Sequence, residues 1–268
     1  VHKMDVKSKT PTQGAQSLRR ALAVLRLVAE TQEHGIRLVD LVAGTGLNRP
    51  TVHRLLQVLR EEGVVEQDED TRRYRVGAEL ALLGMARGNR FPIRGVAEPF
   101  LHELAAKVGD TVFLTIRQGA DSIAIDRVTG RYPIQVLATE TGVRRPLGVG
   151  VAGVVMLASM PSAEAMALIS GNARRLARLG LTVARLQARV AEARATGYAW
   201  APSGVVPNTS AVSVPVLDEH GEALAAVTVA AMADRLANDR LDEVVAALQD
   251  TVRRIARRRK EMAARRMR

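Results

Sequence analysis

One segment, residues 38–76, constrains the fold more than any other part of the chain. Residues 38–43 are predicted to form a short apolar helix, which ends where a Gly-Thr-Gly sequence permits the tight turn between two crossing helices. Asn48 can cap a second helix, since Pro50 falls in its first turn and apolar residues follow at helical spacing. Two alternating stretches around a polar turn, within residues 64–76, then predict a hairpin. This order of elements is typical of a winged helix-turn-helix, which binds DNA.

The second of these helices has an apolar side and a cationic side. Guanidinium and amide groups on the cationic side suit the edges of guanine and adenine, or phosphate oxygens. Such a surface is usually only solvated, but its place between a capped turn and a basic hairpin favours DNA binding. Another helix is predicted before these two, at residues 17–28. Its side against the helix capped by Asn48, the reading helix, is expected to consist of Leu18, Leu22, Leu25 and Val28. The predicted DNA contacts are Arg19, Arg20, Asn48, Arg49, Pro50, Thr51, His53, Arg54, Gln57, Arg72, Arg73 and Tyr74.

Several stretches carry a pattern more specific than composition. They are Ser-Leu-Arg-Arg-Ala-Leu at 17–22, Thr-Gly-Leu-Asn-Arg-Pro-Thr-Val-His-Arg-Leu-Leu at 45–56, Arg-Tyr-Arg-Val-Gly at 73–77, Gly-Tyr at 197–198 and Val-Pro-Val at 214–216. With them, nearly the whole chain after its first dozen residues resembles the IclR family of bacterial transcription regulators. The family usually has Pro and Ser where this chain has Asn48 and Pro50, a difference that concerns the operator sequence rather than the fold.

Length and patterning indicate two domains, since 268 residues exceed one typical core. Beyond the hairpin, helices and extended segments alternate along the second domain. Helices are expected at residues 96–108, 184–196 and 241–258. Extended segments are expected at 111–118, 122–129, 134–139, 211–217 and 224–231, with a hairpin turn at 218–221. This predicts an α+β fold with an antiparallel sheet. The resemblance implies a GAF-like effector-binding domain. The expected division is a flexible arm at 1–15, the winged helix-turn-helix at 16–77, a linker helix at 78–89, the effector-binding domain at 90–260 and a basic tail at 261–268.

The net charge of +11 comes mostly from the end of the chain, because residues 253–268 hold nine basic side chains and one acidic side chain. This end either adds phosphate contacts or is the solvated end of a helix, and the second interpretation is favoured. The absence of cysteine excludes disulfides, thiolate nucleophiles and Cys-ligated zinc. Five scattered histidines predict no metal site, and no cofactor is expected. Without a long apolar run or a signal-peptide pattern, we expect a cytoplasmic protein with no membrane partner.

A Gly-rich sequence at residues 148–153 matches G-x-G-x-x-G before a predicted helix. A dinucleotide site also needs an acidic residue about 20 positions later, and residues 168–173 have none. Two interpretations carry about equal weight. The free N–H groups of Val151, Ala152 and Gly153 form an anion site, or the glycines only permit tight packing. In the family the corresponding turn lies at the effector pocket, so the resemblance implies a ligand carboxylate there.

Two further differences from the family bear on the ligand. The family often has acidic residues after its Gly-Tyr pair, where this chain has Ala-Trp-Ala-Pro-Ser at 199–203, and polar residues on its late strands. We therefore expect a bulkier, partly apolar ligand such as an aromatic acid. Trp200 either stacks on it or packs in a core or interface, and of the neighbouring arginines 144 and 145 we choose Arg144 as the carboxylate clamp. The predicted effector-binding residues are Arg144, Val151, Ala152, Gly153, Trp200, Ala201, Ala211, Thr228 and Ala230.

The chain carries no recognisable catalytic constellation, neither a G-x-S-x-G elbow nor a P-loop, so it is not expected to be an enzyme. The predicted function is that of an IclR-type, ligand-responsive regulator, a repressor or an activator, controlling the catabolism of a small organic acid. Its expected partners are double-stranded operator DNA, the acid effector and further copies of the chain, in a homodimer or a dimer of dimers. The alternative is a small-molecule-binding protein or enzyme whose N-terminal domain mediates protein interactions.

Overall fold

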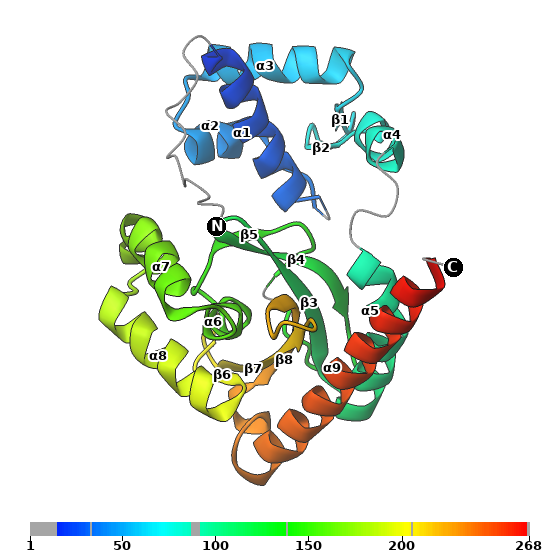
Figure 1. Cartoon of the computed structure of the whole chain (residues 1–268). Helices are drawn as coiled ribbons and strands as arrows, with labels where there is room; N and C mark the ends of the chain where they lie inside the picture. Colours follow the sequence, from blue (N-terminus) through cyan, green and yellow to red (C-terminus); the bar gives the residue numbers. More distant parts are fainter. Residues whose placement is uncertain (1–14, 33, 87–91, 138, 205, 267–268) are drawn as a thin grey trace. The chain divides into compact units, whose positions relative to one another are not determined.

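The computed structural model describes residues 15–32, 34–86, 92–137, 139–204 and 206–266. Contacts within the chain divide it after Gly88 into two compact units (Figure 1). The expected flexible arm lies outside the described residues except for Ala15, and so do the expected start of the second domain at residue 90 and the last two residues of the expected tail.

The first unit contains the predicted helix, turn, helix and hairpin in order. Gly46 ends the second helix with a φ of 67°, a backbone conformation that favours glycine, and Asn48 Oδ1 accepts a hydrogen bond of 3.0 Å from the Thr51 N–H at the start of the third helix. The elements are α1 (Gln16–Glu30), α2 (Leu38–Thr45), α3 (Arg49–Glu61), β1 (Val65–Gln67), β2 (Tyr74–Val76) and α4 (Ala78–Ala86).

The core of this unit uses only part of the predicted side of α1. Leu18 and Leu22 are 62% and 40% exposed, whereas Val28 is fully buried as expected. Val24, one turn before Val28, is also fully buried, although it was not predicted. The prediction that Leu18 and Leu22 pack against the reading helix is therefore wrong, while Leu25 packs against the core in part.

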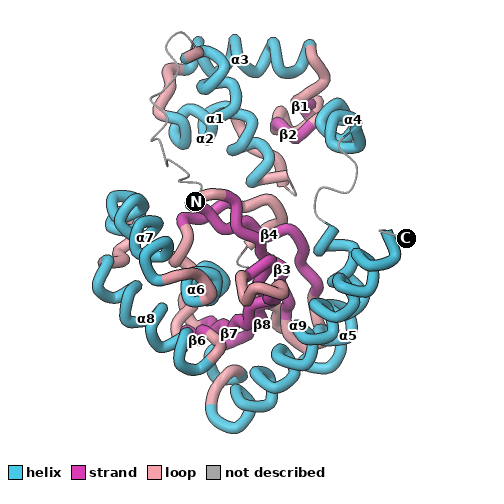
Figure 2. Tube along the Cα trace, viewed as in Figure 1, coloured by secondary structure: helices cyan, strands magenta, loops and turns pink. Residues whose placement is uncertain are grey.

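The second unit is built on a curled antiparallel sheet of six strands, drawn in magenta in Figure 2. Its strand order is β5-β4-β3-β8-β7-β6, so the short strands β5 and β6 form the edges. The bounds are β3 (Thr111–Gln118), β4 (Asp121–Val128), β5 (Arg144–Pro146), β6 (Ala199–Ala201), β7 (Thr209–Leu217) and β8 (Ala223–Met232).

One predicted extended segment, residues 134–139, forms no strand in the part that the structure describes. The side chain of Gln135 fixes this segment in place of ladder hydrogen bonds. Its Nε2 donates to the carbonyl oxygens of Gly109 (3.0 Å) and Tyr132 (2.6 Å), and its Oε1 accepts from Thr111 Oγ1 (2.8 Å).

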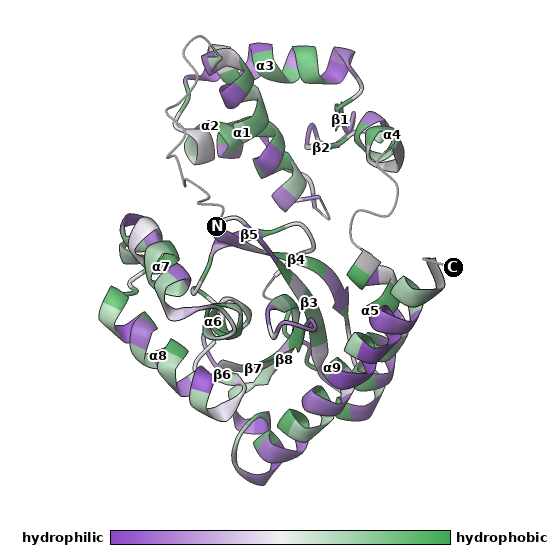
Figure 3. Cartoon of the chain, in the orientation of Figure 1, coloured by the Kyte–Doolittle hydropathy of each residue, from purple (hydrophilic) through white to green (hydrophobic). Residues whose placement is uncertain are grey.

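Helices cover both faces of this sheet (Figure 1). The pair α5 and α9 packs on one face, and α6, α7 and α8 lie on the other. Helix α6 is apolar on all sides, as its green colour in Figure 3 shows, and six of its eight residues are buried. The bounds are α5 (Pro92–Val108), α6 (Val151–Ala158), α7 (Ser162–Ala177), α8 (Val183–Thr196), η1 (Ala233–Arg235) and α9 (Asn238–Arg266). Helix α7 was not predicted, and α9 continues through most of the expected basic tail.

Side chains of β3 alternate between the two faces. Val112, Leu114 and Ile116 belong to the core beneath α5 and α9, whereas Phe113 and Thr115 face the other side of the sheet. The same alternation on the neighbouring strands decides which residues are available for a binding site.

A buried carboxylate ties two distant parts of this unit together. Asp110 is 1% exposed and precedes β3, and it accepts hydrogen bonds from Arg235 Nε at 3.0 Å and from Arg240. Arg235 also lies over the Tyr132 ring, 3.5 Å from its centroid, and the hydrogen bond to Asp110 raises the pKa of Arg235. Asp110 thus joins the end of α5 to η1 and α9.

Replacing Asp110 with asparagine should lower the free energy of unfolding by about 2–3 kcal/mol, because two arginines lose their buried counterion. Asp250→Asn is the matched control. Its pair with Arg253 is 3.6 Å long and both side chains are more than half exposed, so we expect a change below about 0.5 kcal/mol. Urea unfolding measures both, and equal values for the two variants would contradict a structural role for Asp110.

Candidate functional site

Helix α3 presents polar and cationic side chains on the side opposite its core residues. Val52 and Leu56 are buried, while His53 and Arg54 between them are exposed. The exposed predicted residues are Arg49, Pro50, His53, Arg54 and Gln57. Asn48 is exposed as well, but its side-chain oxygen caps α3, and Thr51 is half-buried and supplies the capped N–H. This surface offers guanidinium, imidazole and amide groups on one rigid helix.

The hairpin departs from the prediction at two positions. Arg72 is exposed at the turn, as expected, but Arg73 Nη1 folds back and donates to the Gly35 carbonyl at 2.9 Å. Tyr74 is only 5% exposed and belongs to the core, so its predicted contact with DNA is wrong. Its backbone pairs with Ile36, and this pairing turns the ring inward. In the turn, hydrogen bonds from Thr71 lower the pKa of Asp68.

The two arginines of α1 differ in exposure. Arg19 is exposed and Arg20 is half-buried. Both lie in the first turns of the helix, beside the exposed Leu18.

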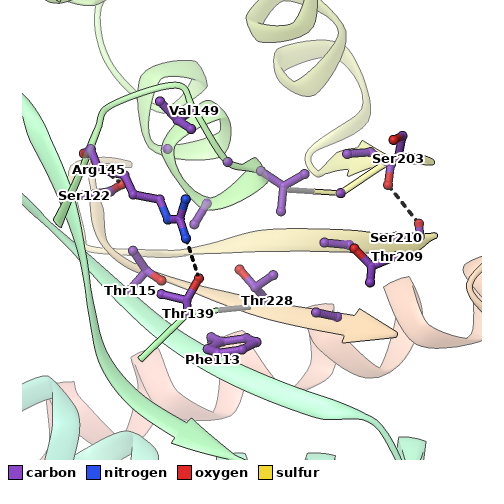
Figure 4. Close-up of a pocket in the computed structure, with 18 of the residues that line it drawn as sticks. Phe113, Thr115, Ser122, Thr139, Arg145, Val149, Ser203, Thr209, Ser210 and Thr228 are labelled. Atoms are coloured by element: carbon purple, nitrogen blue, oxygen red, sulfur yellow. Dashed lines mark hydrogen bonds between the residues drawn. The ribbon is translucent and has the colours of Figure 1, made fainter. Parts of the chain in front are cut away.

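The second unit contains a cavity of about 820 Å³ between the sheet and α6 and α8. Its floor consists of the residues of β3, β4, β7 and β8 that face away from α5 and α9, and its roof contains the start of α6 (Figure 4). Phe113, Val136 and Ala230 form an apolar cluster on this floor, while Thr115, Ser122 and Thr228 supply hydroxyl groups. Apolar walls with few polar groups are typical of small-molecule sites.

Most of the predicted effector-binding residues line this cavity. They are Val151, Ala152, Gly153, Trp200, Ala201, Ala211, Thr228 and Ala230. The indole Nε1 of Trp200 donates to Ser210 Oγ at 3.1 Å, and this hydroxyl donates to the Ala201 carbonyl at 2.8 Å. These bonds fix the orientation of a ring that remains 37% exposed.

The structure corrects the choice between the paired arginines. Arg144 does not line the cavity, because its guanidinium lies 3.7 Å from Asp121 and donates to Gln118 at 2.7 Å. Arg145 lines the cavity instead, and its Nη2 donates to Thr139 Oγ1 at 3.3 Å (Figure 4). Neighbouring residues of a strand point to opposite faces, so only one of the pair can reach the cavity.

Helix α8 contributes charged lining residues that the sequence analysis missed. Arg185, Arg189 and Glu192 follow at spacings of four and three and line the same cavity. Burial lowers the pKa of Arg189, and the neighbouring charge of Arg185 lowers it further. Arginines at this spacing are common on solvated helices, so the sequence carried no signal that could have identified them.

The Gly-rich turn packs closely, as one interpretation of its sequence expects, and its place beside the cavity leaves the anion-site interpretation as a prediction. A Cβ at Gly153 would lie 2.5 Å from the Gly148 nitrogen, and one at Gly148 would lie 2.5 Å from Leu186 Cδ2, so these two glycines permit close packing. Gly150 has no such neighbour within 4 Å and is the N-cap of α6. The helix has no side-chain cap, and its first residues Val151, Ala152 and Gly153 line the cavity.

Among the described residues, no group of three or more His, Asp or Glu side chains has the arrangement of a metal site. Within the same residues, no helix is long and apolar enough to cross a membrane.

Gly153→Ala should lower the free energy of unfolding by about 1–3 kcal/mol, because its methyl group would contact backbone atoms that cannot move aside easily. Gly150→Ala should stay within about 1 kcal/mol of the original protein, since its φ is −107° and the space around it is open. Chemical denaturation compares the two. If Gly150→Ala is the more damaging change, the packing interpretation of Gly153 is wrong.

Comparison with known proteins adds to this geometry. The model for the IclR helix-turn-helix domain matches residues 17–69, and the model for the bacterial transcriptional regulator IclR C-terminal domain matches residues 85–257. The glycerol operon regulatory protein of Streptomyces coelicolor is 31% identical over 90% of this chain and 95% of its own length.

Two solved structures share the fold. The IclR regulator of Alicyclobacillus acidocaldarius covers 90% of this chain and 98% of its own, with a TM-score of 0.70 and 23% identity. An IclR homologue of Microbacterium hydrocarbonoxydans, in complex with 4-hydroxybenzoate, covers the same shares with a TM-score of 0.69 and 22% identity. Since the two family models together span most of the sequence, this chain belongs to the IclR family of bacterial transcriptional regulators.

Proposed function

We propose that the protein binds operator DNA through α3 and that an organic acid with an apolar body, such as an aromatic acid, controls this binding from the cavity of the second unit. The observation that carries the proposal is the cavity itself, whose lining combines apolar residues with hydroxyl and cationic groups. The groups proposed for the carboxylate are the N–H groups at the start of α6 and the guanidinium of Arg145.

The proposed DNA interface has α3 in a major groove. Arg49, Arg54 and Gln57 reach base edges or phosphates from one side of the helix, while the exposed Arg72 contacts the backbone from the hairpin. Arg73 and the arginines of α1 are proposed only for phosphate contacts, because phosphates accept hydrogen bonds from many directions. The full proposed set is Arg19, Arg20, Asn48, Arg49, Pro50, Thr51, His53, Arg54, Gln57, Arg72 and Arg73.

The ligand class rests on the chemistry of the cavity walls. Phe113 and Trp200 offer aromatic surface, and Ala211 and Ala230 leave room for a ring over the sheet. The Microbacterium homologue is complexed with 4-hydroxybenzoate, which supports an aromatic acid as the ligand of this chain. We propose that the carboxylate lies at the start of α6, near Arg145.

The proposed regulator is an assembly of identical chains in the cytoplasm, a dimer or a dimer of dimers, without enzymatic activity. Paired α3 helices then enter successive major grooves. Leu18, Leu22, Leu82 and Leu83 are 40–62% exposed on the first unit, which favours self-association there. A coupling of about 1–3 kcal/mol between cavity and DNA changes operator affinity roughly 5- to 150-fold.

Arg54→Ala should weaken binding to DNA from the protein's own upstream region by about 1–3 kcal/mol, because a guanidinium contact to a base edge is lost. Fluorescence anisotropy against random DNA, at two salt concentrations, measures the specific part. Arg178→Ala removes the same charge from an exposed position of the second unit and serves as the control. An unchanged ratio of specific to random binding in Arg54→Ala would contradict the proposed orientation of α3.

Arg145→Gln should weaken the binding of 4-hydroxybenzoate or benzoate at least about tenfold, since a charge-assisted hydrogen bond to the carboxylate is lost. The neighbouring Arg144→Gln is the matched control, because its guanidinium is engaged with Asp121 and Gln118 outside the cavity. Isothermal titration calorimetry measures both. A larger loss in Arg144→Gln than in Arg145→Gln would refute the proposed position of the carboxylate.

A further inference from the structure

The α8 wall of the cavity holds charges that the proposed carboxylate site does not use. Arg185, Arg189 and Glu192 lie on one side of this helix, while Leu186 and Val190 on the adjacent side are buried in the core beneath α6. The wall therefore carries two cations and one anion, and among the described residues that line the cavity Glu192 is the one acidic side chain.

Arg189 is the most unusual of the three. It is half-buried, and among the described residues no hydrogen bond or ion pair reaches its guanidinium. The neighbouring Arg185 adds repulsion at the i, i+4 spacing, which destabilises a helix slightly. Glu192, three residues after Arg189 on the same helix, is one anion for these two cations, so the wall has one counterion too few. The cavity is the side from which an anion can supply the missing counterion.

Arg145, one part of the proposed carboxylate site, and this cationic wall belong to opposite edges of the sheet. Arg145 belongs to β5 at one edge of the sheet, whereas α8 packs against β6 at the opposite edge. Figure 4 shows Arg145 and Thr139 at one end of the cavity and Ser203, Thr209 and Ser210 at the other. Its volume of about 820 Å³ is also near the upper end of the roughly 300–1,000 Å³ that small-molecule pockets span. A single ring held at Arg145 leaves the α8 end empty.

We propose that Arg185 and Arg189 form a second anion subsite, and that the effector is an elongated organic diacid with an apolar middle. One carboxylate lies at the start of α6 and Arg145, the apolar middle covers Phe113, and the second carboxylate binds the two arginines of α8. The inference rests on the proposed function of the cavity, and it narrows the ligand class from an organic acid to a diacid.

The test compares acids that differ only in the second carboxylate. Biphenyl-4-carboxylate is paired with biphenyl-4,4′-dicarboxylate, and octanoate with octanedioate, and each is titrated by calorimetry into the full-length protein. Trp200, the single tryptophan, lines the cavity and reports by its fluorescence that the aliphatic acids bind there. We expect at least one diacid to bind about tenfold more tightly than its monoacid, or better.

Arg189→Gln and Arg185→Gln should each reduce the advantage of the diacid at least about fivefold and change the affinity for the monoacid less than twofold. Without ligand, Arg189→Gln should melt at the same temperature as the original protein or higher, because repulsion on α8 is relieved. The control is Arg178→Gln, an equal change of charge at an exposed position outside the cavity, which should leave the advantage intact.

The outcomes separate the two proposals. If monoacids bind and no diacid binds better, or if the advantage survives both α8 variants, the second subsite is refuted and the proposed function stands. If no acid of either kind binds the original protein, the proposed function and the subsite fail together. The comparison of diacid with monoacid needs no variant, so it remains decisive even if a substitution impairs folding.

Discussion

The alternation of side chains along the central strands is the constraint on which the second unit depends. On β3 the residues that face α5 and α9 are large and branched, and they fill a solid core. The opposite face carries one large residue, Phe113, among Thr115, Ala211, Thr228 and Ala230. Small side chains on this face cannot reach the helices above them, so a cavity remains. The cavity is therefore a consequence of residue size on one face of one sheet.

The helix above this face makes the remaining space usable for an anion. Because α6 is apolar on all sides, it is held by packing against β7, β8 and α8 rather than by polar contacts. Gly148 and Gly153 allow the turn to approach the helix closely, and the uncapped start of α6 lines the cavity. In the proposed site, this helix start binds one anion with Arg145 of β5, and the arginines of α8 bind a second.

Much of this architecture could be predicted from local chemistry. The cap at Asn48, the turn at Gly46 and the bounds of β3 follow from rules that act within a few residues. The choice between Arg144 and Arg145 could not be predicted, because a strand of three residues has too few positions to fix which side faces inward. Tyr74 was misplaced for a related reason, since its pairing with Ile36 joins segments far apart in sequence. The role of the charged residues of α8 could not be predicted either, because it depends on the cavity beside the helix, which the sequence does not reveal.

The cavity can select among ligands because some ligands leave its charged groups without a partner. An acid with one carboxylate satisfies the start of α6 and leaves Arg185 and Arg189 with Glu192 as their one counterion on α8, whereas a diacid supplies a second anion. Discrimination between them therefore includes the cost of a partly buried, unpaired cation, in addition to the attraction of a new ion pair. The same cost exists in the empty protein, where Arg185 and Arg189 repel each other across one turn of α8. A ligand that removes this repulsion stabilises α8 in its position beside the cavity. The ligand-free and ligand-bound forms of the second unit then differ in how firmly α8 is held.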